Sequence, residues 1–197
     1  MNVQSTLFAK HALLPTGWAR DVSLSWNAQG TLYDVTPGTA PTANMQSAAG
    51  PLIPGMPNLH SHAFQRAFAG RTEHRSPGAQ NDSFWSWRDL MYRFAGAITP
   101  EQLRVIATAL YVEMLQAGYT SVCEFHYVHN DVDGRPYADD ATLCACLLDA
   151  AQAAGIGLTL LPVLYQTSGF GGKAPSTEQC RFIRSTDNML MLLQQLQ

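Results

Sequence analysis

Two histidines separated by a single residue are the side chains of this sequence best suited to chemistry. His60 and His62 directly follow the apolar, proline-rich segment 51–59. If residues 56–59 form the end of a short strand, side chains two positions apart point to the same side. Both imidazoles can then reach one metal ion, for which zinc is the first choice and iron or manganese are alternatives. The other interpretation of so short a pattern is a pair of ordinary surface or hydrogen-bonded histidines.

Two later histidines are weaker candidates. If residues 120–127 form a regular strand, His126 points to the face opposite that of Tyr127, and His129 lies in the turn beyond. We expect structural roles for both. Residues 130–134 resemble a calcium loop, but a histidine occupies its first ligand position, so a plain turn is favoured.

Strand and helix patterns alternate in the second half of the sequence, which must position these side chains. The segment 119–127 is β-prone, and 156–165 has the length and near-continuous hydrophobicity of a strand buried on both faces. Three helical patterns lie around these strands: one from the Thr99–Pro100 capping signal to Gly118, one over 143–154 and one from Ser185 to Gln197. The alternation predicts a parallel α/β sheet or barrel.

The first 54 residues have a different texture, rich in Gly, Pro, Ser, Thr and Ala. Short alternating stretches at 21–26 and 31–35 are separated by a turn-like segment, which is typical of a hairpin. We therefore expect a small β-sandwich-like domain over 1–54 and an α/β domain over 55–197. The aromatic-rich segment 62–98 is too long for an ordinary connection and is expected to be a lid or binding loop.

Composition limits the class of protein. The 197 residues are 46% hydrophobic and 14% charged, with a net charge of −3, which suits a packed core and offers no basic footprint for nucleic acid. No apolar run approaches the roughly 20 residues that span a bilayer. The four cysteines form no C-x-x-C pair, and no secretory signal is visible. The sequence thus predicts a soluble, cytoplasmic protein that binds neither nucleic acid nor membrane.

The run from Pro54 to Gly70 resembles the first barrel strand of the amidohydrolase superfamily and, within it, the formimidoylglutamate deiminase family. The resemblance extends from about Ala12 to the last residue. The H-x-H pattern identifies only the superfamily, and other stretches narrow the resemblance to the deiminases: Phe84–Arg88, Gly118–Tyr127, Leu160–Tyr165 and Gly169–Gly172.

The resemblance implies a role for each matching residue. His60 and His62 would be two ligands of the metal, while Gln65, Arg88 and Tyr127 would bind the substrate, formiminoglutamate. A guanidinium suits the bidentate capture of a carboxylate. The implied reaction is hydrolysis of the formimino C=N bond of N-formimino-L-glutamate to N-formyl-L-glutamate and ammonia. Taken alone, an arginine in an aromatic segment is more often a solvated or stacked residue, the tyrosine is equally a packing residue, and the glutamine carries no signal.

Length argues against a complete site. Catalytic zinc generally has three protein ligands, but no histidine follows His129. A full barrel takes about 250 residues, so 55–197 suffices for about three βα units of a TIM barrel. We expect the N-terminal fragment of a longer enzyme, inactive alone, whose other ligands and proton-transfer residues lie beyond Gln197. The resemblance allows a homodimer for that enzyme.

Two other functions stay open at this point. One is a deaminase of the same superfamily that acts on a purine, pyrimidine or triazine ring. The other is a non-catalytic binding domain in which the histidines are structural.

Overall fold

The computed structural model describes residues 5–71 and 84–197, with residues 84–86 described by their backbone only. The chain divides into two compact units, Met1–Gly55 and Met56–Gln197, which are described separately. Part of the long segment predicted as a lid or binding loop, residues 72–83, lies outside the described residues.

The first unit contains one four-stranded sheet. Strands β1 (Ser5–Leu14), β2 (Gly17–Trp26) and β3 (Leu32–Thr36) pair antiparallel, and the short β4 (Gln46–Ser47) pairs parallel with β1. The predicted hairpin is confirmed as β2–β3. A second layer, as a sandwich requires, is not confirmed among the residues that the structure describes in this unit.

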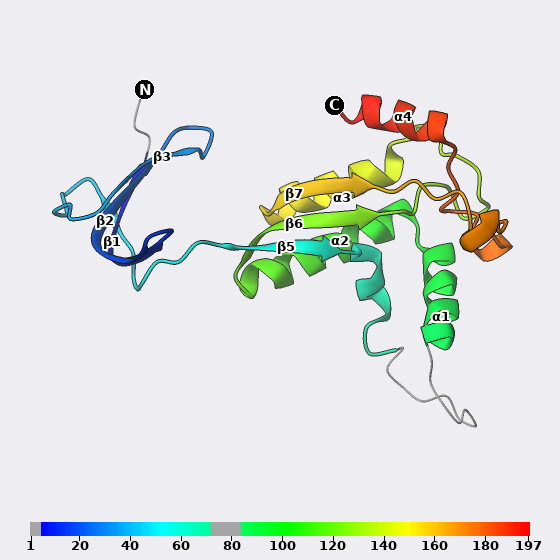
Figure 1. The fold of residues 1–197 in the computed structure, drawn as a ribbon, viewed down its shortest axis with the longest axis horizontal. Coiled ribbons are helices and arrows are strands. Elements are labelled where there is room, and N and C mark those ends of the chain that lie inside the picture. The colour runs from blue at the N-terminus through cyan, green and yellow to red at the C-terminus, as the bar shows by residue number, and fades with distance from the viewer. Residues whose placement is uncertain (1–4, 72–83) are drawn as a thin grey trace. The chain divides into compact units, whose positions relative to one another are not determined.

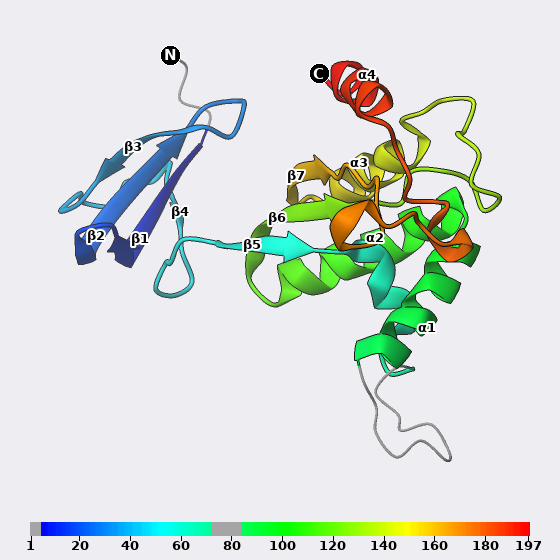
Figure 2. The ribbon, with the colours of Figure 1, turned by 45° about the vertical axis from the view of Figure 1, so that its right-hand side comes forward.

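The second unit is built on a parallel three-stranded sheet. Its strands lie in the order β5 (Met56–Ser61), β6 (Tyr119–His126) and β7 (Gly157–Pro162). Helices α2 (Pro100–Gln116) and α3 (Thr142–Ala154) lie together on one face of this sheet (Figure 1, Figure 2). Along the chain α2 comes between β5 and β6, α3 comes between β6 and β7, and α4 (Thr186–Gln195) follows β7. This order agrees with the three predicted βα units.

Helix boundaries follow local signals in the sequence. Thr99 caps α2 in a capping box with Gln102, and Pro100 occupies the first helical turn. Gly155 ends α3 with a left-handed φ of 83°. Ser185 caps α4, which ends at Gln195 rather than running to the last residue.

Two expectations for the second unit need correction. Segment 156–165 is not a strand buried on both faces: β7 is shorter, and Leu161 is 40% exposed because the described helices cover only one face of the sheet. The segment 62–98 is not simply a loop. It contains the 3₁₀ helix η1 (Ala63–Phe68) and the fourteen-residue helix α1 (Phe84–Ala97).

A buried cation fastens the end of α1 to the rest of the unit. Arg181 is 1% exposed and donates hydrogen bonds to the carbonyl oxygens of Ala95 and Ile98, at 2.5 and 2.8 Å. It also donates to the carbonyl of Asn130, which follows β6, at 2.9 Å. Carbonyls at a helix C-terminus carry partial negative charge, so they offset the cost of burying the guanidinium.

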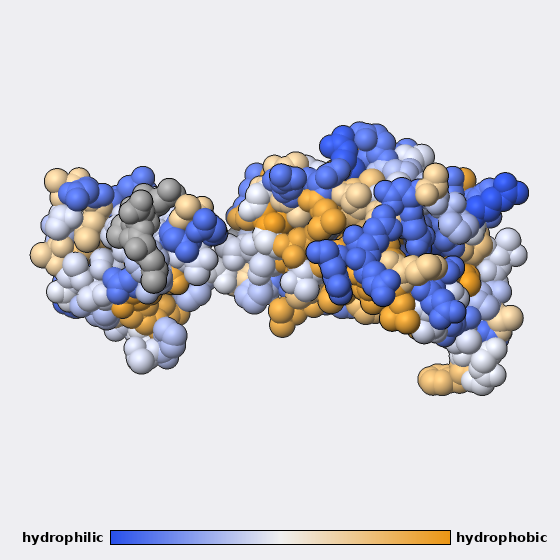
Figure 3. Space-filling view, turned by 90° about the horizontal axis from the view of Figure 1, so that it is seen from above, coloured by the Kyte–Doolittle hydropathy of each residue, from blue (hydrophilic) through white to orange (hydrophobic). Residues whose placement is uncertain are grey.

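The surface of the second unit carries several large apolar side chains. Leu59, Leu161 and Leu164 are 72%, 40% and 42% exposed. Figure 3 shows apolar side chains gathered on the face of this unit that it displays. Within the described residues, no helix has both the length and the apolar character needed to cross a membrane.

Candidate functional site

The two histidines singled out by their spacing meet at the carboxyl end of β5. The Nε2 atoms of His60 and His62 lie 3.0 Å apart, and their rings make an edge contact with centroids 4.6 Å apart. Two nitrogens bound to one tetrahedral zinc at the usual bond length lie about 3.3 Å apart. The observed separation is close to that of two ligands of one ion, and it is also the length of an imidazole–imidazole hydrogen bond. The two side chains lie on one side, as the spacing predicted.

The backbone of β6 fixes the orientation of the second histidine. Nδ1 of His62 lies 2.8 Å from the carbonyl oxygen of Phe125. A carbonyl only accepts, so Nδ1 carries the hydrogen and the neutral ring presents the Nε2 lone pair to an ion. Burial lowers the pKa of His62; the Phe125 carbonyl opposes this shift, and His60 adds to it. The neutral form is the one that binds metal.

A buried carboxylate braces the backbone on both sides of His62. Glu124, 1% exposed, accepts hydrogen bonds from the backbone N–H of Ala63 at 2.5 Å and from the hydroxyl of Tyr111 at 3.3 Å. The Ser61 side chain also hydrogen-bonds it. Burial raises the pKa of Glu124, and these hydrogen bonds offset part of that rise.

The sequence contained a signal for this bracing role that our interpretation did not use. Val122, Glu124 and His126 occupy every second position of β6, so all three side chains lie on the buried face of the strand. This face is covered by the helices. A charged residue in that register has to find polar partners inside the protein.

Two of the three predicted substrate residues contact each other. The side-chain amide Nε2 of Gln65, in η1, donates to the Tyr127 hydroxyl at 3.1 Å. Tyr127 directly follows β6 on the side of the histidine pair, with its ring centroid 5.1 Å from that of His62. Arg88 comes from α1, and its guanidinium carbon lies 5.5 Å from the centre of the Tyr92 ring.

A cavity of about 220 Å³ opens beside this cluster. Phe182, 1% exposed, lies among three tyrosine rings, those of Tyr92, Tyr127 and Tyr165, with centroid distances of 5.1 to 5.8 Å. The rest of the described lining is apolar apart from one histidine: Met91, Phe125, Val163 and His62.

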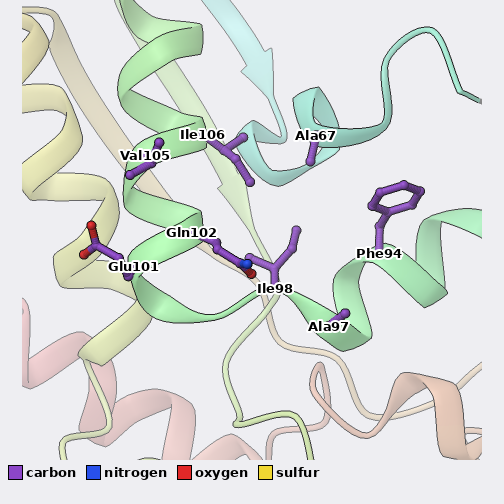
Figure 4. A pocket seen from close by; sticks show the side chains of 8 residues that line it. All are labelled: Ala67, Phe94, Ala97, Ile98, Glu101, Gln102, Val105 and Ile106. Atoms are coloured by element: carbon purple, nitrogen blue, oxygen red, sulfur yellow. The ribbon is translucent and has the colours of Figure 1, made fainter.

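A larger groove, of about 460 Å³, lies elsewhere in this unit. Figure 4 shows its lining from η1, α1 and the start of α2, with Phe94, Ile98 and Ile106 among the apolar members. Among the described residues of that lining Glu101 is the one that carries a charge, and neither histidine of the pair is included. Chemistry therefore favours the smaller cavity.

The two later histidines, His126 and His129, are buried away from the pair. His126 is 3% exposed on the opposite face of β6 from Tyr127, as its strand position predicted. His129 is also 3% exposed, and its Nε2 lies 2.9 Å from the carbonyl oxygen of Val163. Burial lowers the pKa of both rings, that of His129 to about 4. Both rings are therefore neutral at pH 7.

The described residues supply only part of a metal site. They contain no group of three or more His, Cys, Asp or Glu side chains that could hold an ion. The donor set at the carboxyl end of β5 is thus two imidazole nitrogens.

Sequence comparison finds two matching families. The profile described as "Formimidoylglutamate deiminase HutF, N-terminal domain" matches residues 4–46, and that of the "Amidohydrolase family" matches residues 52–187. A formimidoylglutamate deiminase of Pseudomonas aeruginosa is 56% identical over 192 residues, which cover 98% of this chain and 42% of that protein. The chain thus spans less than half the length of this curated relative.

Solved structures give a similar result. An amidohydrolase from Brucella melitensis superposes with a TM-score of 0.88 at 45% identity, over 97% of this chain and 42% of that one. The atrazine chlorohydrolase TrzN from Arthrobacter aurescens TC1, solved in complex with zinc, superposes with a TM-score of 0.67 at 16% identity, over 98% and 42% of the respective chains. The second similarity is one of fold.

Proposed function

Because this chain belongs to the amidohydrolase family, we propose that the whole protein is a metal-dependent deiminase that hydrolyses the formimino C=N bond of N-formimino-L-glutamate. The observation that carries the metal-dependent part is the 3.0 Å approach of the His60 and His62 Nε2 atoms. The 56% identical deiminase supports the choice of substrate.

In this proposal His60 and His62 hold a zinc ion, with further ligands supplied by segments outside this chain. Bound there, the ion supplies the Lewis acidity that makes water a nucleophile near neutral pH. Water adds to the formimino carbon, the bond to the imino nitrogen breaks, and ammonia leaves as the formyl C=O forms.

The other proposed site residues bind and orient the substrate. Arg88 captures a carboxylate, for which a guanidinium is suited. Tyr127 accepts a hydrogen bond from Gln65, and its own O–H hydrogen is directed to the Met91 sulfur at 3.9 Å. A thioether sulfur is a weak acceptor, so in this proposal that hydrogen turns to donate to a substrate oxygen or nitrogen. The proton-transfer residues are proposed to lie in the segments that follow this part of the chain in its relatives.

Metal content tests the first half of the proposal. Elemental analysis of the whole protein should find about one zinc per chain, and His60→Ala or His62→Ala should lose most of it. His11→Ala, which alters a histidine of β1 in the first unit, is the matched control. Zinc retained in both site variants would contradict the metal assignment. The 197-residue chain alone should neither hold zinc tightly nor turn over formiminoglutamate.

Ammonia release from formiminoglutamate tests the second half. Arg88→Met should raise the KM by about a hundredfold, given the cost of losing a charge-assisted pair. Arg93→Met, on the exposed side of the same helix, should leave the KM unchanged. Turnover of a purine, pyrimidine or triazine instead, unaffected by Arg88→Met, would favour the ring deaminase. Zinc-free protein without turnover would favour a binding domain.

We also propose that residues 1–54 form a separate β domain and that its sheet is one layer of a sandwich. The support is a small core of Ala9, Ala12 and Val22, together with apolar side chains such as Trp18, which is 62% exposed. A cytoplasmic location is proposed as well. Its support is that all four cysteines are free thiols in the described structure.

A further inference from the structure

One wall of the small cavity is organised by a buried amide. Gln179, 3% exposed, belongs to the short helix η3 (Thr177–Gln179). Its Nε2 donates to the hydroxyl of Tyr92 at 2.9 Å and to that of Tyr165 at 2.7 Å. The two tyrosines come from α1 and from the segment after β7, so one amide joins two separate parts of the lining.

The orientation of this amide is set by its other end. The backbone N–H of Ser176 lies 2.8 Å from the Gln179 Oε1 atom. A backbone N–H only donates, so the atom facing it must be the carbonyl oxygen, and the NH₂ group must face the tyrosines. Both NH₂ hydrogens are thereby used.

This arrangement determines which hydrogens of the Tyr92 and Tyr165 hydroxyls can be donated to a ligand. Each tyrosine oxygen already accepts a hydrogen from Gln179, so each hydroxyl keeps its own hydrogen to donate. The two hydroxyls also hydrogen-bond each other, so one of their two hydrogens is used within the pair and one is left to donate elsewhere. Tyr92 and Tyr165 both line the cavity.

We propose that Gln179 is a positioning residue that holds the hydroxyl pair of Tyr92 and Tyr165 so that its one remaining hydrogen is donated toward a carboxylate of the ligand. This inference rests on the proposed function, which supplies a dicarboxylate substrate. A carboxylate only accepts hydrogen bonds, and this wall of the cavity has a hydroxyl hydrogen left to donate, so the two are complementary. The Arg88 guanidinium beside the Tyr92 ring adds the complementary charge.

The same arrangement of a glutamine amide and a tyrosine hydroxyl occurs a second time at the cavity, between Gln65 and Tyr127. There too a glutamine amide donates to a tyrosine hydroxyl, and the tyrosine lines the cavity. The ring of Phe182 contacts all three tyrosines, which gives the hydroxyls a common apolar base. Each hydroxyl is therefore fixed at both its ring and its oxygen.

The test is the Gln179→Glu variant of the whole protein. The new carboxylate can still accept from Ser176, but it turns the tyrosine hydrogens toward itself and adds negative charge. The dissociation constant of glutarate, measured by calorimetry, should rise at least about tenfold. The KM for formiminoglutamate should rise by a similar factor, while kcat should change less than about threefold. Gln152→Glu, the same change at an exposed position of α3, is the matched control and should alter neither value.

Tyr165→Phe provides a second variant that keeps the ring packing if Gln179→Glu does not fold. It should weaken glutarate binding about fivefold, as expected for one lost hydrogen bond. Dimethyl glutarate, which lacks charge, should bind wild type weakly and equally in all variants. Unchanged glutarate affinity in folded Gln179→Glu or in Tyr165→Phe would overturn the proposal.

The two proposals fail in different ways. If wild type binds glutarate through this wall but does not hydrolyse formiminoglutamate, only the proposed function is lost. If wild type hydrolyses it and the variants bind glutarate as wild type does, only the positioning role is lost.

Discussion

Acidification from pH 7 to pH 4 should destabilise the second unit through His129. The ring is 3% exposed, and its Nε2 hydrogen bonds the carbonyl of Val163 at 2.9 Å. Burial lowers the pKa of His129 from 6.5 to about 4, the carbonyl opposes this shift, and the positive charge of Arg184 adds to it. A neutral imidazole is therefore built into the folded protein.

The sign and size of the effect follow from proton linkage. Between pH 6.5 and 4 the unfolded chain binds a proton at this histidine that the folded chain does not. The stability that neutral His129 contributes is thus present above about pH 6.5 and lost as the pH falls toward 4. A shift of about 2.5 pKa units corresponds to about 3 kcal/mol of unfolding free energy.

Urea unfolding of a protein that retains His129 and of its His129→Gln variant at pH 7, 6, 5 and 4 measures this contribution. Glutamine does not titrate, yet its amide can still donate to the Val163 carbonyl. The protein with His129 should lose about 3 kcal/mol more than the variant over this range, with most of the difference appearing between pH 6 and 4. The ring of His126 lies 5.4 Å from that of His129, and His129 contributes to lowering the pKa of His126, so both proteins carry His126→Gln to keep this neighbour from contributing. Parallel pH profiles, within about 0.5 kcal/mol, would refute the reasoning.

Three further predictions concern stability and are tested by urea unfolding at pH 7. Thr99→Ala removes the cap of α2 and should cost about 1 kcal/mol, whereas Thr99→Ser should restore it. Gly134→Ala should cost about 1 to 3 kcal/mol, because the added Cβ would lie 2.8 Å from the Cβ of Cys180 and because the φ of +82° at this position disfavours any side chain. A neutral effect would contradict the fold of this turn. Arg181→Met should lower the free energy of unfolding by about 3 kcal/mol or more, since it leaves buried carbonyl oxygens without a hydrogen-bond donor. A decrease below about 1 kcal/mol would show that water takes the place of the guanidinium.

Local signals made much of the fold predictable from the sequence. The capping box at Thr99 and the glycine at 155 act within one turn of a helix, so they gave the boundaries of α2 and α3 to within about two residues. The two-residue spacing of His60 and His62 placed them on one side because strand geometry requires it.

Helix α1 was missed although a signal existed. Trp87, Met91, Phe94 and Ile98 recur at helical spacing, and Met91 and Ile98 are buried in the core cluster. The density of aromatic residues in the segment favoured a binding loop, and the periodicity should have taken precedence.

Long-range partners could not be predicted from the sequence. Gln179 ends the short helix η3 and Arg181 follows it, in a part of the chain without long elements, where a polar residue is ordinarily solvated. Their burial depends on contacts with α1, more than eighty residues earlier in the chain. For the same reason, the sequence identified Tyr127 but neither Tyr92 nor Tyr165 as part of the cavity.

The buried Arg181 also has a consequence for the order of folding. It closes loops of 86 and 83 residues to Ala95 and Ile98, whereas the first pairs of the sheet, Met56 with Tyr119 and Ser121 with Gly157, span 63 and 36 residues. Contacts that are distant in sequence pay the larger loop-closure entropy and form later. We expect helix α1 to dock only after residues 176–184 have left the ribosome, so the tyrosine-lined cavity forms last on a sheet that is already assembled.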